Sequence, residues 1–244
     1  MKGAFMKKHI CAMALTLALA AGGLSLASDL KMADGHILPL GNEMTIREAD
    51  KSYVGKELQK EWNREKAEKE ILPAVRRMGL FGKGDTVHEK MMAEQLGKLF
   101  AAGRFSQLQM ETKDAFHQAA VVSVKLEKKD IAGWNEIIRA MEKAHPEKID
   151  ILGENRTLNL ETIRESMKKE DSNNRFVYKK DGQTEFVYGS MFLFVEQYGV
   201  EAPFYVFFIA SADKGQLGAT AIYTNQATGR IIEPVLVKGA EGLR

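Results

Sequence analysis

The sequence predicts an α+β fold: a three-layer α/β/α sandwich with a mostly antiparallel sheet, preceded by a long charged N-terminal helix. Residues 186–195 and 204–212 alternate as strands do, and both alternating sets of side chains are apolar. A strand that is apolar on both sides needs cover on both faces, and helical patterns stand before and after these segments. The short turns between successive strands favour antiparallel pairing.

Composition and charge place the chain among ordinary globular proteins. It has 244 residues, of which 45% are hydrophobic and 28% are charged. This balance differs from that of disordered or multi-span membrane proteins. The formal net charge is +2, and lysines near the N-terminus contribute to it. The rest of the chain is close to neutral, so its charge balance does not predict nucleic-acid binding.

Residues 1–27 have the pattern of a secretory signal peptide. Lysines come first, an uncharged apolar run covers residues 10–21, and Ser25-Leu26-Ala27 is a small-x-small cleavage site. The uncharged stretch up to Ala27 is also close to the shortest that spans a bilayer, so an uncleaved membrane anchor is the alternative. We expect an exported protein, periplasmic or extracellular. Cys11 is the only cysteine, so leader removal would leave no disulfide and no cysteine ligand.

Three regions are predicted after the leader. Residues 28–44 are expected to be a tether, residues 45–103 a helical N-terminal region, and residues 104–244 the α/β sandwich domain. The helical region begins with a capping box at Thr45–Glu48, which satisfies free amides at a helix start. Apolar residues at roughly helical spacing extend this charged helix to Leu72. Its alternating lysines and glutamates form either a solvated face or a partner-binding arm.

Helices and strands alternate through the middle of the chain. A second capping box at Thr86–Glu89 opens another helix. Residues 105–112 and 119–126 alternate as strands, with a hairpin turn between them. Asp130 then caps a helix that a His-Pro pair ends.

The last third of the chain supplies the rest of the sheet. A shorter helix over residues 160–170 precedes it. Asp181-Gly182 is a strong hairpin signal between two strands. Residues 217–225 form a further strand. A closing helix starts near Ile231 and carries Pro234 near its beginning, where proline is tolerated.

The order of these late elements resembles that of a known group. The hairpin at residues 180–183, an aromatic strand, the strand at Pro203–Phe208, a short turn, a final strand and a C-terminal helix resemble the end of the PsbP-like proteins. Those proteins are exported α/β/α sandwiches. The resemblance covers residues 131–244 and includes no diagnostic motif. It implies an accessory, non-catalytic binding or assembly role and carries over no functional residue.

Motifs for metal binding and catalysis are incomplete in this chain. His88-Glu89 begins the zinc-protease motif H-E-x-x-H, but residue 92 is Met. Residues 82–87 resemble a phosphate loop that lacks its third glycine and its Ser/Thr. Ser166 and Lys169 match S-x-x-K, but the Ser-Asp-Asn and Lys-Thr-Gly motifs that accompany it in acyl-transfer enzymes are missing.

The remaining candidates are single residues. Ser190 follows a glycine inside a strand pattern and lacks the rest of G-x-S-x-G. The histidines after the leader show no ligand spacing: His36, His88, His117 and His145. Each is expected at a surface or a helix cap. We therefore predict no catalytic residue, no cofactor-binding residue and no metal ligand.

These expectations favour an exported, non-enzymatic binding or accessory protein of a bacterial cell envelope. The expected partner is an envelope protein or a small apolar ligand, not nucleic acid, with membrane contact only through an uncleaved leader. Two alternatives stay open. The abundance of Phe and Met favours a small-ligand or lipid carrier with an apolar pocket. The other alternative is a hydrolase whose residues meet only in the folded protein.

Overall fold

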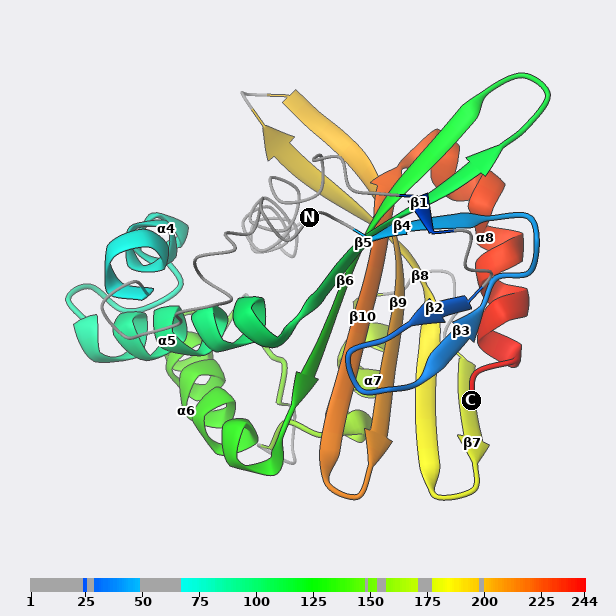
Figure 1. Ribbon diagram of the computed structural model, residues 1–244. Coiled ribbons are helices and arrows are strands. Elements are labelled where there is room, and N and C mark those ends of the chain that lie inside the picture. The colour runs from blue at the N-terminus through cyan, green and yellow to red at the C-terminus, as the bar shows by residue number, and fades with distance from the viewer. Residues whose placement is uncertain are drawn as a thin grey trace.

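The computed structural model of this protein describes residues 24–25, 29–48, 67–147, 149–152, 157–170, 177–197 and 200–244. It contains one large antiparallel sheet, a separate two-stranded hairpin and helices on several sides of the sheet (Figure 1). This combination confirms the predicted α+β class.

An 8-stranded sheet forms the centre of the fold, and all neighbouring strands in it are antiparallel. In spatial order the strands are β1 (Leu24–Ser25), β4 (Thr45–Glu48), β5 (Arg104–Glu111), β6 (Phe116–Leu126), β10 (Gln216–Asn225), β9 (Val200–Asp213), β8 (Thr184–Gln197) and β7 (Val177–Asp181). The predicted Asp-Gly hairpin is confirmed: it joins β7 to β8, and Asp181 pairs with Thr184. Gly182 has a φ of 61°, which glycine adopts readily.

The helices divide into two groups (Figure 1). One group packs together and consists of the π-helix η1 (Ala67–Ile71), α4 (Leu72–Met78), α5 (Thr86–Ala102) and α6 (Lys128–Ala144). The other group contacts strands β8 and β9 and consists of α7 (Leu160–Glu170) and α8 (Gln226–Glu241). In Figure 1, α4, α5 and α6 lie to the left of the sheet and α8 lies to its right.

Neighbouring residues of β8 point to opposite faces of the sheet. Phe186 belongs to a buried cluster that includes Leu236 of α8 and Leu38 of the separate hairpin. Val187 belongs to a different cluster, with Leu160 of α7. Both helices contact β8 and β9. Alternate residues of β8 thus belong to two separate buried clusters, one with residues of α8 and the other with residues of α7.

A third buried cluster holds the other helices together. Its members include Val75 of α4, Met92 of α5, and Ile137 and Met141 of α6. Gly103 follows α5 directly and β5 begins at the next residue. Helix α5 also contacts β6, whose end leads into α6. This connection brings the last turn of α5, the end of β6 and the first turn of α6 to one place.

The start predicted for the N-terminal helix is wrong. Thr45–Glu48 is strand β4, in which Ile46 pairs with Leu108 of β5 and is only 4% exposed. A four-residue capping pattern is local information, and burial of Ile46 against a neighbouring strand overrides it. The rest of the predicted helix up to residue 66 lies outside the described residues. Pro73 does not break a helix, because it occupies the first turn of α4.

The segment predicted as a tether is instead a hairpin. Strands β2 (Asp29–Lys31) and β3 (Ile37–Pro39) pair with each other, and Leu30, Leu38 and Leu40 are buried in the cluster that α8 contributes to. Alternating apolar side chains suit a short strand with one covered face. Burying them removes apolar surface from water, which a solvated tether would leave exposed.

Helix starts also differ from those predicted. Asp85 rather than Thr86 is the N-cap of α5, and Glu127 rather than Asp130 is the N-cap of α6. Carboxylates cap helix starts as hydroxyls do, so both helices still form where expected. Helix α8 begins at Gln226, well before the predicted start, so Pro234 lies inside the helix.

Candidate functional site

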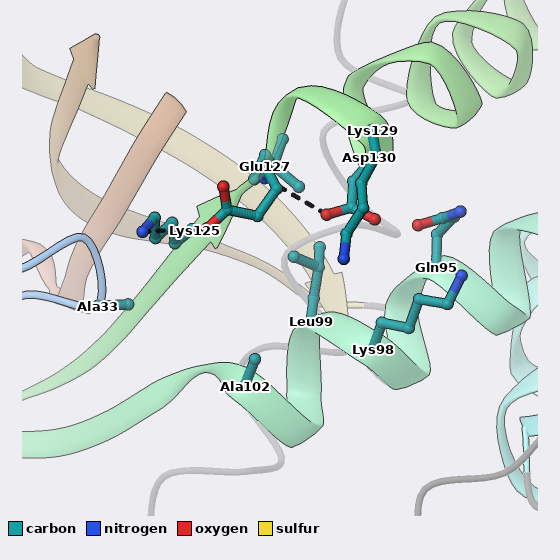
Figure 2. A pocket seen from close by; sticks show the side chains of 10 residues that line it. Ala33, Gln95, Lys98, Leu99, Ala102, Lys125, Glu127, Lys129 and Asp130 are labelled. Atoms are coloured by element: carbon teal, nitrogen blue, oxygen red, sulfur yellow. Dashed lines mark hydrogen bonds and ion pairs between the residues drawn. The ribbon is translucent and has the colours of Figure 1, made fainter. Parts of the chain in front are cut away.

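A cavity of about 630 Å³ lies where β6 runs into α6, beside the last turns of α5. Its lining comes from α5, β6, α6 and the loop after β2, and Figure 2 shows these side chains around the opening. The lining combines lysines, carboxylates and aliphatic groups. Concave sites with a few polar groups on an apolar wall are where proteins commonly bind small ligands.

The first turn of α6 forms one wall of the cavity. Glu127 and Asp130 make a reciprocal capping box, in which the Glu127 side chain accepts from the backbone N–H of Asp130. Asp130 Oδ2 accepts from the backbone N–H of Glu127 at 3.3 Å (Figure 2). These bonds satisfy amides that have no partner within the helix. The fold itself therefore fixes both carboxylates of the lining.

Glu127 is also neutralised from the side of the sheet. Lys125 Nζ lies 3.0 Å from one carboxylate oxygen, and Gln216 of β10 donates to the other at 2.8 Å. The hydrogen bond from Lys125 is the largest influence on the pKa of Glu127, and it lowers that pKa; burial opposes this, while Gln216 and Lys129 add to it. Glu127 is therefore ionised at neutral pH, with Lys125 as its counter-charge.

Helix α5 forms the opposite wall. Gln95, Lys98, Leu99 and Ala102 line the cavity, and their spacing puts them on one face of the helix. Gly133 of α6 faces this wall, and a Cβ at that position would lie 3.0 Å from Gln95 Nε2. The small residue allows α5 and α6 to approach at the cavity.

The loop after β2 closes one side of the cavity through Ala33. The backbone N–H of Ala33 donates to Ser123 Oγ of β6 at 2.8 Å, and this hydroxyl is 2.7 Å from Thr220 Oγ1 of β10. Ser123 and Thr220 are 1% and 2% exposed. The buried hydroxyl of Ser123 is thus hydrogen-bonded both to this loop and to Thr220.

The same loop brings a serine, an aspartate and a histidine together. Ser211 of β9 donates to Asp34 Oδ2. His36 Nδ1 lies 2.9 Å from the same oxygen but is not aligned for a hydrogen bond, and its ring packs edge-on against Phe186. In a nucleophilic triad the histidine stands between the serine and the acid, so that it can take the serine proton. Here the aspartate stands in the middle, and the arrangement anchors the loop.

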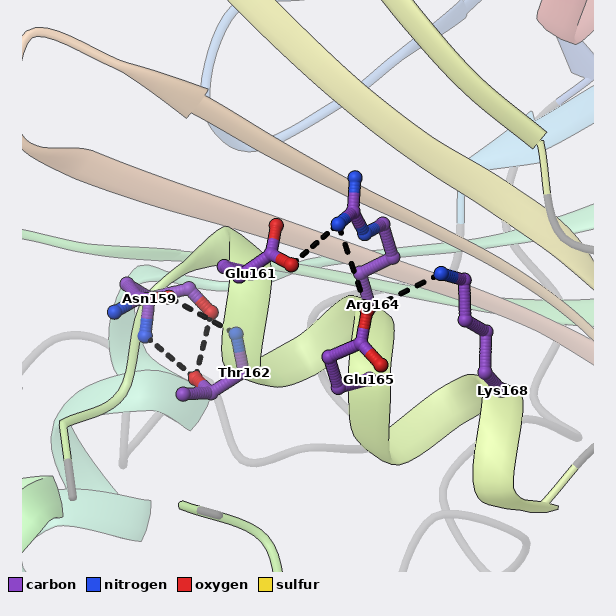
Figure 3. Close-up of polar contacts among 6 residues, drawn as sticks. All are labelled: Asn159, Glu161, Thr162, Arg164, Glu165 and Lys168. Atoms are coloured by element: carbon purple, nitrogen blue, oxygen red, sulfur yellow. Dashed lines mark hydrogen bonds and ion pairs between the residues drawn. The ribbon is translucent and has the colours of Figure 1, made fainter. Parts of the chain in front are cut away.

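Residues of the incomplete serine motifs make contacts that hold the fold together. Ser190 of β8 is 3% exposed and donates to Glu233 of α8. In α7, Lys168 Nζ donates to Glu165 at 3.1 Å, one turn away. Figure 3 shows this contact within a chain of charged contacts that also joins Glu161 to Arg164. Arg164 also lies over the ring of Tyr178 in β7, 5.7 Å from its centre.

The N-terminus of α7 is capped by its own side chains (Figure 3). Asn159 Oδ1 accepts from the backbone N–H of Thr162 at 2.9 Å, and Thr162 Oγ1 accepts from the backbone N–H of Asn159 at the same distance. This reciprocal pair satisfies amides at the helix start. The polar contacts of α7 are thus accounted for by capping and by a ladder of ion pairs on a solvated face.

The histidines that sequence analysis considered lie apart. His145 Nε2 is 2.8 Å from the carbonyl oxygen of Gly79 at the end of α4, and His117 Nε2 is 3.3 Å from Thr112 Oγ1 in the β5–β6 turn. His88 contacts the cap residue Asp85. Within the described parts of the chain, no group of three or more His, Cys, Asp or Glu side chains is placed to hold a metal ion.

The cavity at the β6–α6 junction is the feature that sequence analysis missed. Its residues come from segments far apart in the chain, and each segment has an ordinary local explanation. Gln95, Lys98, Leu99 and Ala102 read as one face of an amphipathic helix, and Asp130 reads as a cap. The helical spacing of these α5 residues indicates that they share one face of the helix, but it does not reveal which elements that face contacts.

Comparisons with protein-family models, curated proteins and solved structures find no match for this chain. Among the described residues, none of the helices is both long and apolar enough to cross a membrane.

Proposed function

We propose that this chain is an exported, non-enzymatic binding protein of the cell envelope and that the cavity at the β6–α6 junction is its binding site. The observation that carries the proposal is the composition of the lining. Lys125 pairs with Glu127 at 3.0 Å, and Lys98 pairs with Glu94 of its own helix at 3.1 Å. Lys129, in contrast, has no carboxylate within ion-pair distance among the described residues. Glu127 and Asp130 already accept hydrogen bonds from the fold, so Lys129 is the charge of the lining that favours an anionic ligand group.

Aliphatic side chains line the same cavity as these charged groups. Leu99 and Ala102 of α5 and Leu126 of β6 line the cavity. We infer that the ligand carries an anionic group next to a short apolar portion. This ligand class is close to the small-ligand carrier considered from the sequence, but the lining is mixed rather than purely apolar.

The sequence of the leader supports the proposed export to the cell envelope. Lysines, an apolar run and a cleavage site form the signal-peptide pattern of residues 1–27. Strand β1 lies within this leader, so cleavage after Ala27 would remove β1 and leave β4 as the edge of the sheet. The mass of the protein recovered from a periplasmic extract tests this part of the proposal: retention of residues 1–27 there would contradict it.

We further infer a three-layer α/β/α architecture for the sandwich, with α8 on one face and α7 on the other. Its support is the pair of separate buried clusters on the two faces of β8 and β9. The resemblance to PsbP-like proteins accords with this architecture and with an accessory role.

A titration with simple amphiphiles tests the binding proposal. We expect octanoate to shift the methyl NMR signals of Leu99 and Leu126 with a dissociation constant on the order of 1 mM, as suits a ligand of this size. Acetate, which lacks the apolar portion, and octylammonium, which has the opposite charge, serve as controls. Binding of octylammonium at this cavity as tight as that of octanoate would overturn the proposed ligand class.

Two variants locate the site. Ala102→Trp places a large ring in the cavity, and Lys129→Glu reverses a charge of its lining; both should weaken octanoate binding at least about tenfold. The matched controls are Ala227→Trp, at an exposed position of α8, and Lys113→Glu, in the exposed β5–β6 turn. Equal losses in the variants and the controls would remove this cavity from the proposal.

A further inference from the structure

A second cavity, also of about 630 Å³, lies between residues 82–85 and helix α6. It shares no lining residue with the candidate site. The charged or titratable side chains that line it are Lys83, Asp85, His88, Glu136, Arg139 and Lys143. Those of α6 recur every three or four residues, so one face of this helix supplies them.

The imidazole of His88 is held in a fixed orientation within this cavity. Its Nδ1 lies 2.7 Å and 2.8 Å from the two carboxylate oxygens of Asp85. Phe81, which is 8% exposed, stacks on the ring with a centroid distance of 6.2 Å. The other ring nitrogen, Nε2, is 3.8 Å from Glu136 Oε1.

Both carboxylates of the cavity are thus engaged with His88. Asp85 also accepts from the backbone N–H of His88 as the N-cap of α5. Burial raises the pKa of Asp85, but the hydrogen bonds from His88 and the charges of His88 and Lys143 outweigh burial and lower it. Asp85 therefore stays ionised and keeps the imidazole in place.

Two of the three cations of the cavity are not engaged with a carboxylate of the described residues. Among the described residues, Lys83 and Lys143 have no carboxylate within ion-pair distance. Arg139 adds a third positive charge to the lining. At the start of α5 the backbone N–H of His88 already donates to the Asp85 side chain, and that of Thr86 donates to the carbonyl oxygen of Gly84. The cationic side chains are therefore the main groups that could bind a ligand here.

We propose that this cavity is a second binding site, for a small tetrahedral oxyanion such as the phosphate group of a phosphate monoester. Lys83, Arg139 and Lys143 supply its positive charge. Their planar and ammonium donors are those that bind phosphate and sulfate oxygens. The proposal does not depend on the function proposed for the first cavity.

Sulfate is a suitable probe because it is a small tetrahedral dianion. The full chain is titrated with sulfate at neutral pH, at constant ionic strength set with chloride, and followed by backbone amide NMR. We expect saturable shifts at Gly82–His88 and in α6. Inorganic phosphate should shift the same amides.

Variants decide between this site and non-specific effects. Lys143→Gln should weaken sulfate binding at least about tenfold, and its thermal unfolding is measured to confirm that it folds. Lys180→Gln, on the remote strand β7, is the matched control. Linear shifts that chloride reproduces, an unaffected Lys143→Gln variant, or binding of Zn²⁺ in preference to sulfate would overturn the proposal.

Discussion

Ser211 of β9 donates a hydrogen bond to Asp34 Oδ2, although the two residues are 177 positions apart in the chain. The bond fastens the loop after β2 to the centre of the sheet. The same loop places Ala33 at the cavity of the β6–α6 junction. Segments from opposite ends of the chain therefore shape the candidate site together.

Gly218 makes this contact possible. A Cβ at Gly218 would overlap with both Asp34 Oδ2 and Ser211 Oγ. We expect Gly218→Ala to lower the free energy of unfolding by about 1–3 kcal/mol, because the loop must move away from the sheet. Urea unfolding measures the change. Gly82→Ala is the control, since a Cβ there meets nothing within 4 Å; equal midpoints for the two variants would contradict this account of the loop.

Gly229 of α8 gives a second test of close packing. Its Cβ would overlap with the ring and Cβ of Tyr205, which is 0% exposed. Helix propensity alone would make Gly229→Ala stabilising by up to about 1 kcal/mol. We expect the steric overlap to outweigh helix propensity, so that the free energy of unfolding of Gly229→Ala falls by about 1–3 kcal/mol. Thermal unfolding decides the sign, and a raised melting temperature would show that α8 is not packed as closely as described.

Glu142 of α6 holds a loop by a buried carboxylate. It is 7% exposed, and its Oε1 accepts from the backbone N–H groups of Ile151 and Leu152, both at 2.8 Å. Glu142→Ala leaves these amides without their acceptor. We expect it to lower the free energy of unfolding, measured in urea, by about 2–4 kcal/mol. The exposed Glu147→Ala is the control, with an expected change within about 0.5 kcal/mol. A comparable effect of both variants would assign the loss to general charge removal.

The lowered pKa of Glu127 predicts an effect of pH. A carboxyl group whose pKa is lower in the folded than in the unfolded state contributes stability above its unfolded pKa. That contribution is lost as the pH falls through the folded value. We therefore expect Glu127→Gln to be less stable than the unsubstituted chain at pH 7, with the difference shrinking as the pH falls to about 3.

Urea unfolding at several pH values measures this convergence. The variant keeps a side chain that can accept hydrogen bonds, so loss of the carboxylate charge is the main change. A stability difference that is constant between pH 7 and pH 3 would contradict the role of Lys125 and Gln216 as partners of an ionised Glu127.

Local signals explain which elements the sequence predicts. The Asp181-Gly182 turn follows from glycine's access to positive φ, and the alternate apolar residues of β8 belong to two separate buried clusters. At Thr45–Glu48 a local capping pattern competes with pairing to β5, and the long-range contact prevails. The hairpin of β2 and β3 is likewise buried through contacts with α8, which a short local pattern does not reveal.

The candidate site could not be predicted for the same reason. Ala33, Lys98 and Lys129 each lie in a segment with its own local role, and only the meeting of α5, β6 and α6 makes them line one cavity. Part of the second cavity coincides with incomplete motifs in the sequence, the phosphate-loop resemblance of residues 82–87 and the pair His88-Glu89. Lys143 belongs to a later helix and carries no motif, so its part in that cavity follows only from the fold.

Native mass spectrometry of the protein purified from a periplasmic extract tests the central claim most directly. The account predicts that the mature chain carries a small bound anionic molecule and that Ala102→Trp, folded and purified in the same way, does not. Ala227→Trp should retain the ligand. A mature chain that is always free of ligand, or a ligand equally abundant on Ala102→Trp, would contradict binding at the β6–α6 junction.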